Sequence, residues 1–275
     1  MSKGFLIYAN GEEYIRQAVA CAMSIKKNNN SFPVSVLTND NVSLKYLDLF
    51  DHIIKIPWTN DDNTRYQINN RWKTYHATPY DETIVLDSDT LVTENIDYWW
   101  PFLSNYDLFF PNKVFTYRSD VVTSNYYRKA FTANKLPNLY AGIHYFKKCD
   151  FTHKFFKWIE LVNNNWELVY GNYCKEFYPK NPSFDLTVSI VSKILDCDNL
   201  IVNSKVDFIK FVHMKPYLQN WTDVKENWMQ KIGVYLTDDC SLIIGNFLQT
   251  GIFHYTEENF LTDAIMKQFE KYLKL

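Results

Sequence analysis

The chain has 275 residues, of which 47% are hydrophobic, so it can bury the core of one large α/β domain or of two small ones. Its 29 basic residues nearly balance its 31 acidic ones, and a net charge of −2 provides no positive field to hold nucleic acid. Composition therefore disfavours a nucleic-acid-binding protein.

The N-terminal segment predicts a strand, a turn and a helix. Residues 5–9 form a compact apolar run that is typical of a buried strand. Residues 10–13 resemble a capping box, with a side-chain oxygen on Asn10 and a carboxylate on Glu13. An apolar stripe at three- and four-residue spacing then predicts a helix that packs on a sheet: Ile15, Ala18, Val19, Ala22, Met23 and Ile25.

The next strands are predicted at residues 33–37, 52–56 and 83–86. A short helical stretch from residue 71 precedes the last of these and is stopped by Pro79. Because strands separated by helical segments form parallel sheets through right-handed crossovers, we expect a mainly parallel central sheet flanked by helices.

The pattern becomes mixed after this strand, and we find no internal repeat and no low-complexity linker. We therefore expect one continuous domain over residues 1–275, with a core at 1–200 and a C-terminal elaboration at 201–275. Its predicted elements are strands at 108–110, 113–117, 139–146 and 251–255, helices at 122–134, 151–163, 184–195 and 258–273, and a hairpin of 233–236 with 241–244.

The most informative pattern is Asp87-Ser88-Asp89, which directly follows the apolar strand at 83–86. Ligands of parallel sheets bind beyond the carboxyl ends of the strands. In an extended chain, residues two apart point the same way, so both carboxylates can face one ion while Ser88 is turned aside. Two oxygen donors without a neighbouring cysteine suit Mg²⁺ or Mn²⁺. An Asp-x-Asp triplet by itself is often only a turn.

Several segments together resemble a nucleotide-sugar glycosyltransferase of the GT-A fold, of the family 8 type that includes glycogenin and bacterial galactosyltransferases. The likeness covers most of the chain, although only the Asp-x-Asp block is specific. Its carriers are residues 8–14, Arg71 and Lys73, residues 78–81 and 86–92, Ala141-Gly142, Asp185 and His254.

The resemblance implies that Ala9, Asn10 and Tyr14 contact the base and ribose of a nucleoside-diphosphate sugar, with the Tyr14 ring against the base. Asp40, after the second strand, either assists ribose recognition or is a turn residue. We also count Ser88 among the donor-binding residues.

Two basic residues upstream of the acidic pair, Arg71 and Lys73, resemble those that steady the diphosphate or the sugar of the donor. A solvated helix face explains either residue equally well.

The resemblance places a histidine beside the metal, and we predict His254 as the third ligand with Asp87 and Asp89; His213 is the competing choice. The family's Lys-Pro-Trp run after this histidine is replaced here by Tyr255-Thr256-Glu257-Glu258, so Lys215 is a candidate for the missing charge.

The implied reaction is transfer of a sugar from a UDP-sugar to a glycan or other hydroxyl acceptor, with retention of configuration and with Mn²⁺ or Mg²⁺ as cofactor. Asp87 and Asp89 would hold the metal, and Asp185 would be the carboxylate near the anomeric carbon. The acceptor platform is expected from the C-terminal part, with Tyr217, Trp221 and Trp228 as candidates, although a local core explains these rings equally well.

Two other functions stay open at this stage. A phosphohydrolase of the haloacid-dehalogenase type also has a strand followed by Asp-x-Asp, but it favours Thr or Val where this chain has Leu91. A glycosyltransferase-like protein that binds sugar without turnover is the second alternative, and the missing Lys-Pro-Trp run is its best support.

The five cysteines are scattered, odd in number and never in a Cys-x-x-Cys spacing, which argues against a disulfide framework or a zinc site. No N-terminal pattern resembles a signal peptide, and no apolar run reaches the length of a membrane span. We therefore expect a reducing, cytoplasmic setting.

Overall fold

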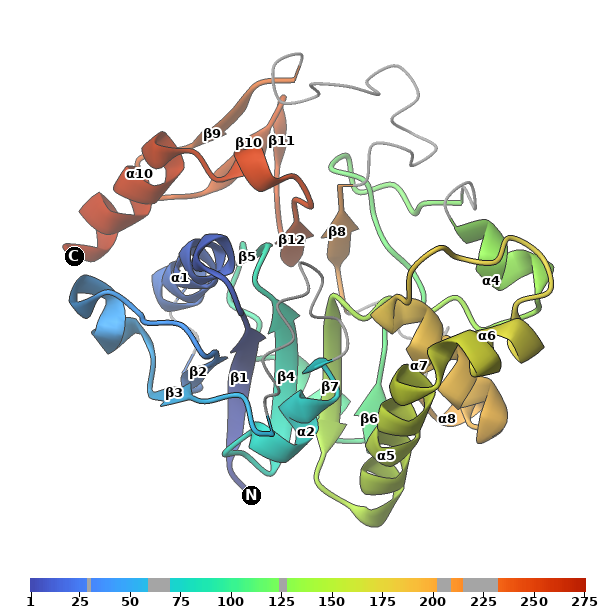
Figure 1. Cartoon of the computed structure of the whole chain (residues 1–275). Coiled ribbons are helices and arrows are strands. Elements are labelled where there is room, and N and C mark those ends of the chain that lie inside the picture. Colours follow the sequence, from blue (N-terminus) through green and yellow to red (C-terminus); the bar gives the residue numbers. More distant parts are fainter. Residues whose placement is uncertain (29–30, 59–69, 124–127, 202–208, 215–231) are drawn as a thin grey trace.

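The fold was examined in a computed structural model of the whole chain (Figure 1). The structure describes residues 1–28, 31–58, 70–123, 128–201, 209–214 and 232–275. The candidates Lys215, Tyr217, Trp221 and Trp228 lie outside these ranges.

A six-stranded sheet forms the centre of the fold, in the order β3-β2-β1-β4-β7-β6. Neighbours among the first four strands pair in parallel, whereas β7 runs antiparallel to both β4 and β6. The predicted α/β class with a mainly parallel central sheet is therefore confirmed. The strands are β1 (Lys3–Tyr8), β2 (Val34–Leu37), β3 (His52–Ile54), β4 (Glu82–Asp87), β6 (Leu108–Phe109) and β7 (Ile143–Lys147).

Both faces of this sheet are covered, which explains why its central strands are continuous apolar runs. Phe5 and Ile84 face one hydrophobic cluster, to which α1 (Glu12–Lys27) and α10 (Asp263–Leu273) contribute. Leu6 and Val85 face the other cluster, on the side of α5 (Asp150–Asn164), α6 (Trp166–Tyr173) and α7 (Phe184–Ile194). These two groups of helices lie on opposite sides of the sheet in Figure 1.

A second, three-stranded sheet lies beyond the carboxyl end of β4 (Figure 1). Its central strand, β12 (Ile252–His254), pairs antiparallel with β5 (Thr90–Val92) and in parallel with β8 (Phe211–His213). Because β5 follows β4 after a two-residue turn, this pairing brings a C-terminal strand next to the Asp-x-Asp segment.

The predicted C-terminal hairpin is present as β9 (Val234–Leu236) and β10 (Leu242–Ile244), extended by β11 (Phe247–Leu248). The remaining short elements connect these layers. They are the 3₁₀ helices η1 (Leu44–Leu49) and η5 (Glu258–Phe260) and the α-helices α2 (Lys73–Ala77), α3 (Trp99–Leu103), α4 (Lys129–Ala133) and α8 (Asp198–Ile201).

Several predictions of local structure were wrong. Gly11, with a φ of 117°, is the N-cap of α1 in place of Asn10, and its N–H donates to Asp40 Oδ2 at 2.5 Å. Residues 113–117 form no strand. Within this segment, Phe115 makes only isolated bridges, to Val121 and Val212. The predicted helix at 122–134 is reduced in the described residues to α4, and residues 124–127 lie outside them.

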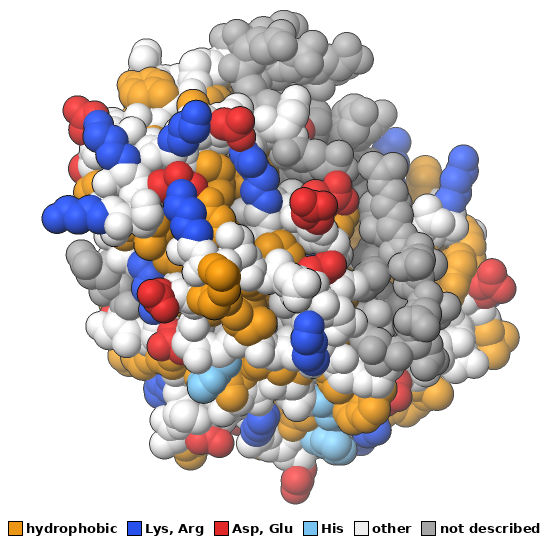
Figure 2. Space-filling view, turned by 60° about the vertical axis from the view of Figure 1, so that its left-hand side comes forward, with side chains coloured by type: hydrophobic (Ala, Val, Ile, Leu, Met, Phe, Trp, Pro, Cys, Tyr) orange, Lys and Arg blue, Asp and Glu red, His pale blue; other side chains and the backbone are white. Residues whose placement is uncertain are grey.

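Basic and acidic side chains are interspersed on the face shown in Figure 2, in agreement with the near-neutral composition. Among the described residues, no helix has both the length and the apolar character needed to cross a membrane. All five cysteines belong to the described residues, and none of them is in a disulfide.

Candidate functional site

The Asp-x-Asp segment forms a tight turn between β4 and β5. Asp87, the last residue of β4, donates its N–H to the Gly142 carbonyl at 2.9 Å, and the Thr90 hydroxyl donates to the Asp87 carbonyl at 2.7 Å. The Tyr255 N–H donates to the Asp89 carbonyl at 3.2 Å. These bonds fix the backbone of both aspartates, so the direction of their carboxylates is set by the sheet.

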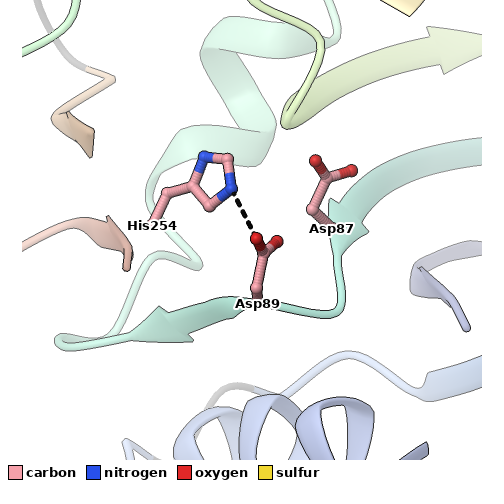
Figure 3. Close-up of side chains that lie close together, drawn as sticks. All are labelled: Asp87, Asp89 and His254. Carbon is pink, nitrogen blue, oxygen red and sulfur yellow. Dashed lines mark ion pairs between the residues drawn. The ribbon is translucent and has the colours of Figure 1, made fainter. Parts of the chain in front are cut away.

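Asp87, Asp89 and His254 converge at this turn (Figure 3). One ligand atom from each lies within 4.8 Å of the others, and His254 Nε2 is 3.0 Å from Asp89 Oδ2. The exposed fractions of the three side chains are 13%, 26% and 10%, so the cluster is sheltered but reachable. The structure therefore brings together the three residues that the sequence singled out as metal ligands.

The donor set fits a divalent metal ion. In an octahedral site with bonds of about 2.1 Å, adjacent ligand atoms lie about 3.0 Å apart. The distance between His254 Nε2 and Asp89 Oδ2 has this value, which is also that of the hydrogen bond between the two side chains. Two carboxylate oxygens and one imidazole nitrogen form a mixed set that suits Mn²⁺ better than Ca²⁺.

The two carboxylates differ in their electrostatic surroundings. Burial raises the pKa of Asp87, and the charge of Asp89 adds to this effect, although the Arg71 guanidinium hydrogen-bonds to Asp87 Oδ1 and opposes it. Burial also acts to raise the pKa of Asp89, but His254 and Arg71 outweigh it and lower that pKa. Two partly buried carboxylates so close together are stabilised by added positive charge, which a metal ion would supply.

Gly142, the residue before β7, leaves room for the three candidate metal ligands. A Cβ atom on Gly142 would lie 3.0 Å from the Phe211 ring, 3.2 Å from His254 Nδ1 and 3.4 Å from Asp87 Oδ2. A side chain at this position would press on two of the three candidate ligands.

A cavity of about 180 Å³ opens beside the cluster. Its aromatic wall contains His213, whose ring stacks on His254 with centroids 4.6 Å apart and an interplanar angle of 28°. Phe211 stacks on both histidines at 5.7 Å. The three-residue cluster contains His254, whereas the competing candidate His213 is its stacking neighbour. The residues that line the cavity are Arg71, Asp87, Tyr140, Gly142, Ser183, Phe184, Asp185, Phe211, His213 and His254.

The predicted catalytic carboxylate, Asp185, belongs to this lining and lies in the first turn of α7. Its Oδ1 accepts the Ala141 N–H at 2.9 Å, and its Oδ2 accepts from Arg128 Nη1 at 2.5 Å. Arg71 lies in the same wall, with its guanidinium 5.6 Å from the centre of the Phe184 ring. Asp185 and Arg71 therefore share one cavity with two of the three metal-ligand candidates, Asp87 and His254.

The other predicted donor residues lie outside the lining of this cavity. Ala9 and Asn10 follow β1, and Tyr14, in α1, packs on the core beside them. The Ser88 hydroxyl donates to Gln17 Oε1 at 2.9 Å, turned toward α1. Lys73 is buried and donates from Nζ to the Trp58 carbonyl at 2.9 Å, and burial lowers the pKa of Lys73.

Sequence reasoning missed two components of this region, Arg128 and Phe211. Arg128 is adjacent to the cavity through Asp185, from which it is 57 residues distant in the chain. Phe211 belongs to β8, a strand that was not predicted because its three residues are too short for a periodic signal.

No protein-family model and no curated protein matches the sequence. Among solved structures, the chain is similar to the glycosyltransferase GlyE of Streptococcus pneumoniae TIGR4, with a TM-score of 0.49 and 14% identity over 99% of this chain. This chain spans 61% of the length of the GlyE chain.

Two further solved structures are similar at this level. One is the galactosyltransferase LgtC in complex with donor and acceptor sugar analogs, with a TM-score of 0.48, 12% identity, and coverage of 98% of this chain and 94% of that one. The other is mouse xyloside xylosyltransferase 1, with a TM-score of 0.49, 8% identity, and coverage of 95% and 100%.

Proposed function

We propose that this protein is a metal-dependent glycosyltransferase that moves a sugar from a nucleoside-diphosphate sugar, a UDP-sugar in the first instance, to a hydroxyl group of a glycan. The observation that carries this proposal is the convergence of Asp87, Asp89 and His254 beside a cavity lined by Arg71 and Asp185. The resemblance of the Asp-x-Asp block to family 8 enzymes supports UDP as the nucleotide and retention as the stereochemical outcome.

Asp87, Asp89 and His254 would hold Mn²⁺ or Mg²⁺. When bound, such an ion neutralises the diphosphate and so stabilises the leaving group as the bond between sugar and phosphate breaks. The turn between β4 and β5 contributes by fixing both aspartates before the metal arrives, since their backbones are hydrogen-bonded to β7 and to Tyr255.

Arg71 serves two purposes in this proposal. It compensates the charge of Asp87, and its guanidinium is one of the cavity-lining groups that can reach a phosphate oxygen. We assign Lys73 only a supporting role, because its ammonium already donates a hydrogen bond to the Trp58 carbonyl.

Asp185 would face the sugar. The transition state of glycosyl transfer carries positive charge near the anomeric carbon, and a fixed carboxylate stabilises that charge. Ala9, Asn10, Tyr14 and Ser88 lie around the carboxyl ends of β1 and β4, where the nucleotide of the donor is expected.

The proposal is tested by incubating the protein with Mn²⁺ and a panel of UDP-, GDP- and CDP-sugars, with and without mixed oligosaccharide acceptors. We expect release of free nucleotide with one class of donor, and we expect EDTA to abolish this release. The melting temperature measured in parallel separates turnover from binding, because a ligand that only binds raises it without being consumed.

Two results would contradict the proposal. A rise in melting temperature with no nucleotide release, across the whole panel, would favour the sugar-binding alternative. Hydrolysis of a generic aryl phosphate without any nucleotide sugar would favour a phosphohydrolase.

A further inference from the structure

Arg128 is a charged residue buried behind the cavity wall. Only 4% of its surface is exposed, and its guanidinium lies 3.7 Å from the centre of the Phe131 ring and 4.2 Å from that of Tyr140. A guanidinium held between two aromatic faces is favourable and keeps its plane fixed. Since Tyr140 also lines the cavity, Arg128 lies behind the cavity wall and contacts one of its lining residues.

The aromatic rings still allow the guanidinium of Arg128 to rotate within its own plane, and its hydrogen bonds prevent this rotation. Its Nε donates to Asn138 Oδ1 at 2.7 Å, its Nη2 donates to the Leu139 carbonyl, and its Nη1 donates to Asp185 Oδ2. These bonds come from both edges of the planar fork, so the guanidinium has one orientation. A lysine has no such fork and could not reproduce the set.

The carboxylate that receives this contact is also held from its other side. Asp185 Oδ1 accepts the Ala141 N–H, one residue before Gly142, and α7 is capped by the Ser183 hydroxyl, which accepts from the Leu186 N–H at 3.2 Å. The Asp185 side chain is nevertheless 29% exposed, and it lines the cavity. It is therefore oriented by the protein while one surface faces the place of the substrate.

We propose that Arg128 is a positioning residue, which sets the direction of the Asp185 carboxylate toward the sugar of the donor. This inference rests on the proposed function and adds to it a residue that touches neither the metal ligands nor the cavity. Because a buried guanidinium needs an anionic partner whatever its role, kcat and the direction of the carboxylate are the readouts that separate positioning from fold stabilisation. A catalytic group displaced by about 1 Å loses on the order of 10²-fold in rate, and this is the effect expected when the link is altered.

A double-mutant cycle tests this coupling, with the variants Arg128→Lys, Asp185→Asn and their combination. We expect Arg128→Lys to lower kcat about 10²-fold while the donor KM stays within about threefold, because the metal and nucleotide contacts are untouched. We expect the double variant to be no slower than Asp185→Asn alone, since Arg128 acts through that carboxylate. Losses that simply multiply would overturn the inference.

Arg118→Lys is the matched control. Arg118 is exposed, lies 5.1 Å from the centre of the Tyr117 ring and donates to the Tyr117 hydroxyl at 2.9 Å, so it has an aromatic contact without a link to the cavity. We expect it to leave kcat unchanged. If Arg128→Lys fails to fold, Asn138→Ala carries the test, because it keeps the guanidinium and removes the acceptor of Nε; an unchanged kcat in this variant would then contradict the inference.

A crystal structure of Arg128→Lys, or of Asn138→Ala in its place, gives a readout that does not depend on activity. We expect the Asp185 carboxylate to turn away from the Ala141 N–H, and an unmoved carboxylate would overturn the inference. If the wild-type protein transfers no sugar, the proposed function fails. The position of Asp185 in the crystal structure of the variant still decides whether Arg128 orients this carboxylate.

Discussion

Strand β4 has a carboxylate at each end, Glu82 and Asp87, and their pKa values are shifted in opposite directions. At the start of the strand, Glu82 is 4% exposed, and its Oε2 receives the Tyr145 hydroxyl at 2.7 Å, the Ser104 hydroxyl at 2.7 Å and the Lys3 ammonium at 3.2 Å. Burial acts to raise the pKa of Glu82, but these hydrogen bonds and the charge of Lys3 outweigh it and lower that pKa.

At the other end, Asp87 is crowded by a second carboxylate, Asp89, and burial raises its pKa even though Arg71 is in contact with it. The cavity and Gly142, which has no side chain, lie beside Asp87. One end of the strand therefore contains a carboxylate with three hydrogen-bond donors, and the other contains a carboxylate that is crowded by a second one. From this difference, and not from burial, we infer that Glu82 is structural and that the acidic pair is the candidate for function.

The largest effect is expected when a carboxylate is removed from the crowded end of β4. Asp89→Asn is expected to lower transfer by at least about 10³-fold, because a metal ligand supplies several kcal/mol of transition-state stabilisation. Its free energy of unfolding should change by less than about 1 kcal/mol, because the substitution also relieves the crowding of Asp87. Nucleotide release and urea unfolding measure the two effects, and a variant that retained full transfer would refute the metal assignment.

The opposite result is expected at the other end. Glu82→Gln should lower the free energy of unfolding by about 2 kcal/mol at neutral pH, the worth of hydrogen bonds to a buried charge, and should leave kcat of the folded protein unchanged.

The effect of Glu82→Gln should depend on pH in a defined direction. Because the folded-state pKa of Glu82 lies below the reference value of 4.5, its stabilisation is complete above that pH and is lost as the pH falls through the folded value. The wild type and the variant should therefore converge in urea unfolding experiments once the pH is below the folded-state pKa. A difference that stayed constant between pH 7 and this value would show that the carboxylate charge is not responsible.

A smaller effect is expected from Gly142→Ala, which tests the space beside the acidic pair. The added methyl would press on His254 and Asp87, and we expect metal affinity to fall about tenfold, as for other changes that disturb the orientation of ligands. Manganese titration followed by nucleotide release measures this.

Gly171→Ala is the matched control, because a Cβ at this position in α6 meets no atom within 4 Å. It should leave metal affinity unchanged and stabilise the helix by about 0.5–1 kcal/mol. Equal affinities in both alanine variants would mean that the room beside the cluster is unimportant.

The parts of the fold that sequence predicted are those with a local signal. The apolar run before Asp87 placed β4, the stripe from Ile15 placed α1, and the turn at residues 237–240 placed the β9–β10 hairpin. The capping box failed because Gly11 adopts a φ of 117° and bonds to Asp40, a partner that lies after another strand.

The residues of the site also differ in whether the local sequence contains a signal for them. Asp87 and Asp89 were predicted from a single stretch of chain, whereas the choice between His254 and His213 depended on the order of strands β5-β12-β8, which no local pattern contains. Arg128 had no signal at all, because its burial results from two rings and a carboxylate that meet only in the folded chain.

We infer that the carboxyl end of β4 binds a divalent cation, and anomalous diffraction from crystals grown with Mn²⁺ and UDP is the decisive experiment. We predict one manganese peak within about 2.3 Å of a carboxylate oxygen of Asp87, a carboxylate oxygen of Asp89 and Nε2 of His254. Crystals that contain UDP but no manganese between these three side chains, or manganese bound elsewhere on the protein, would contradict the account.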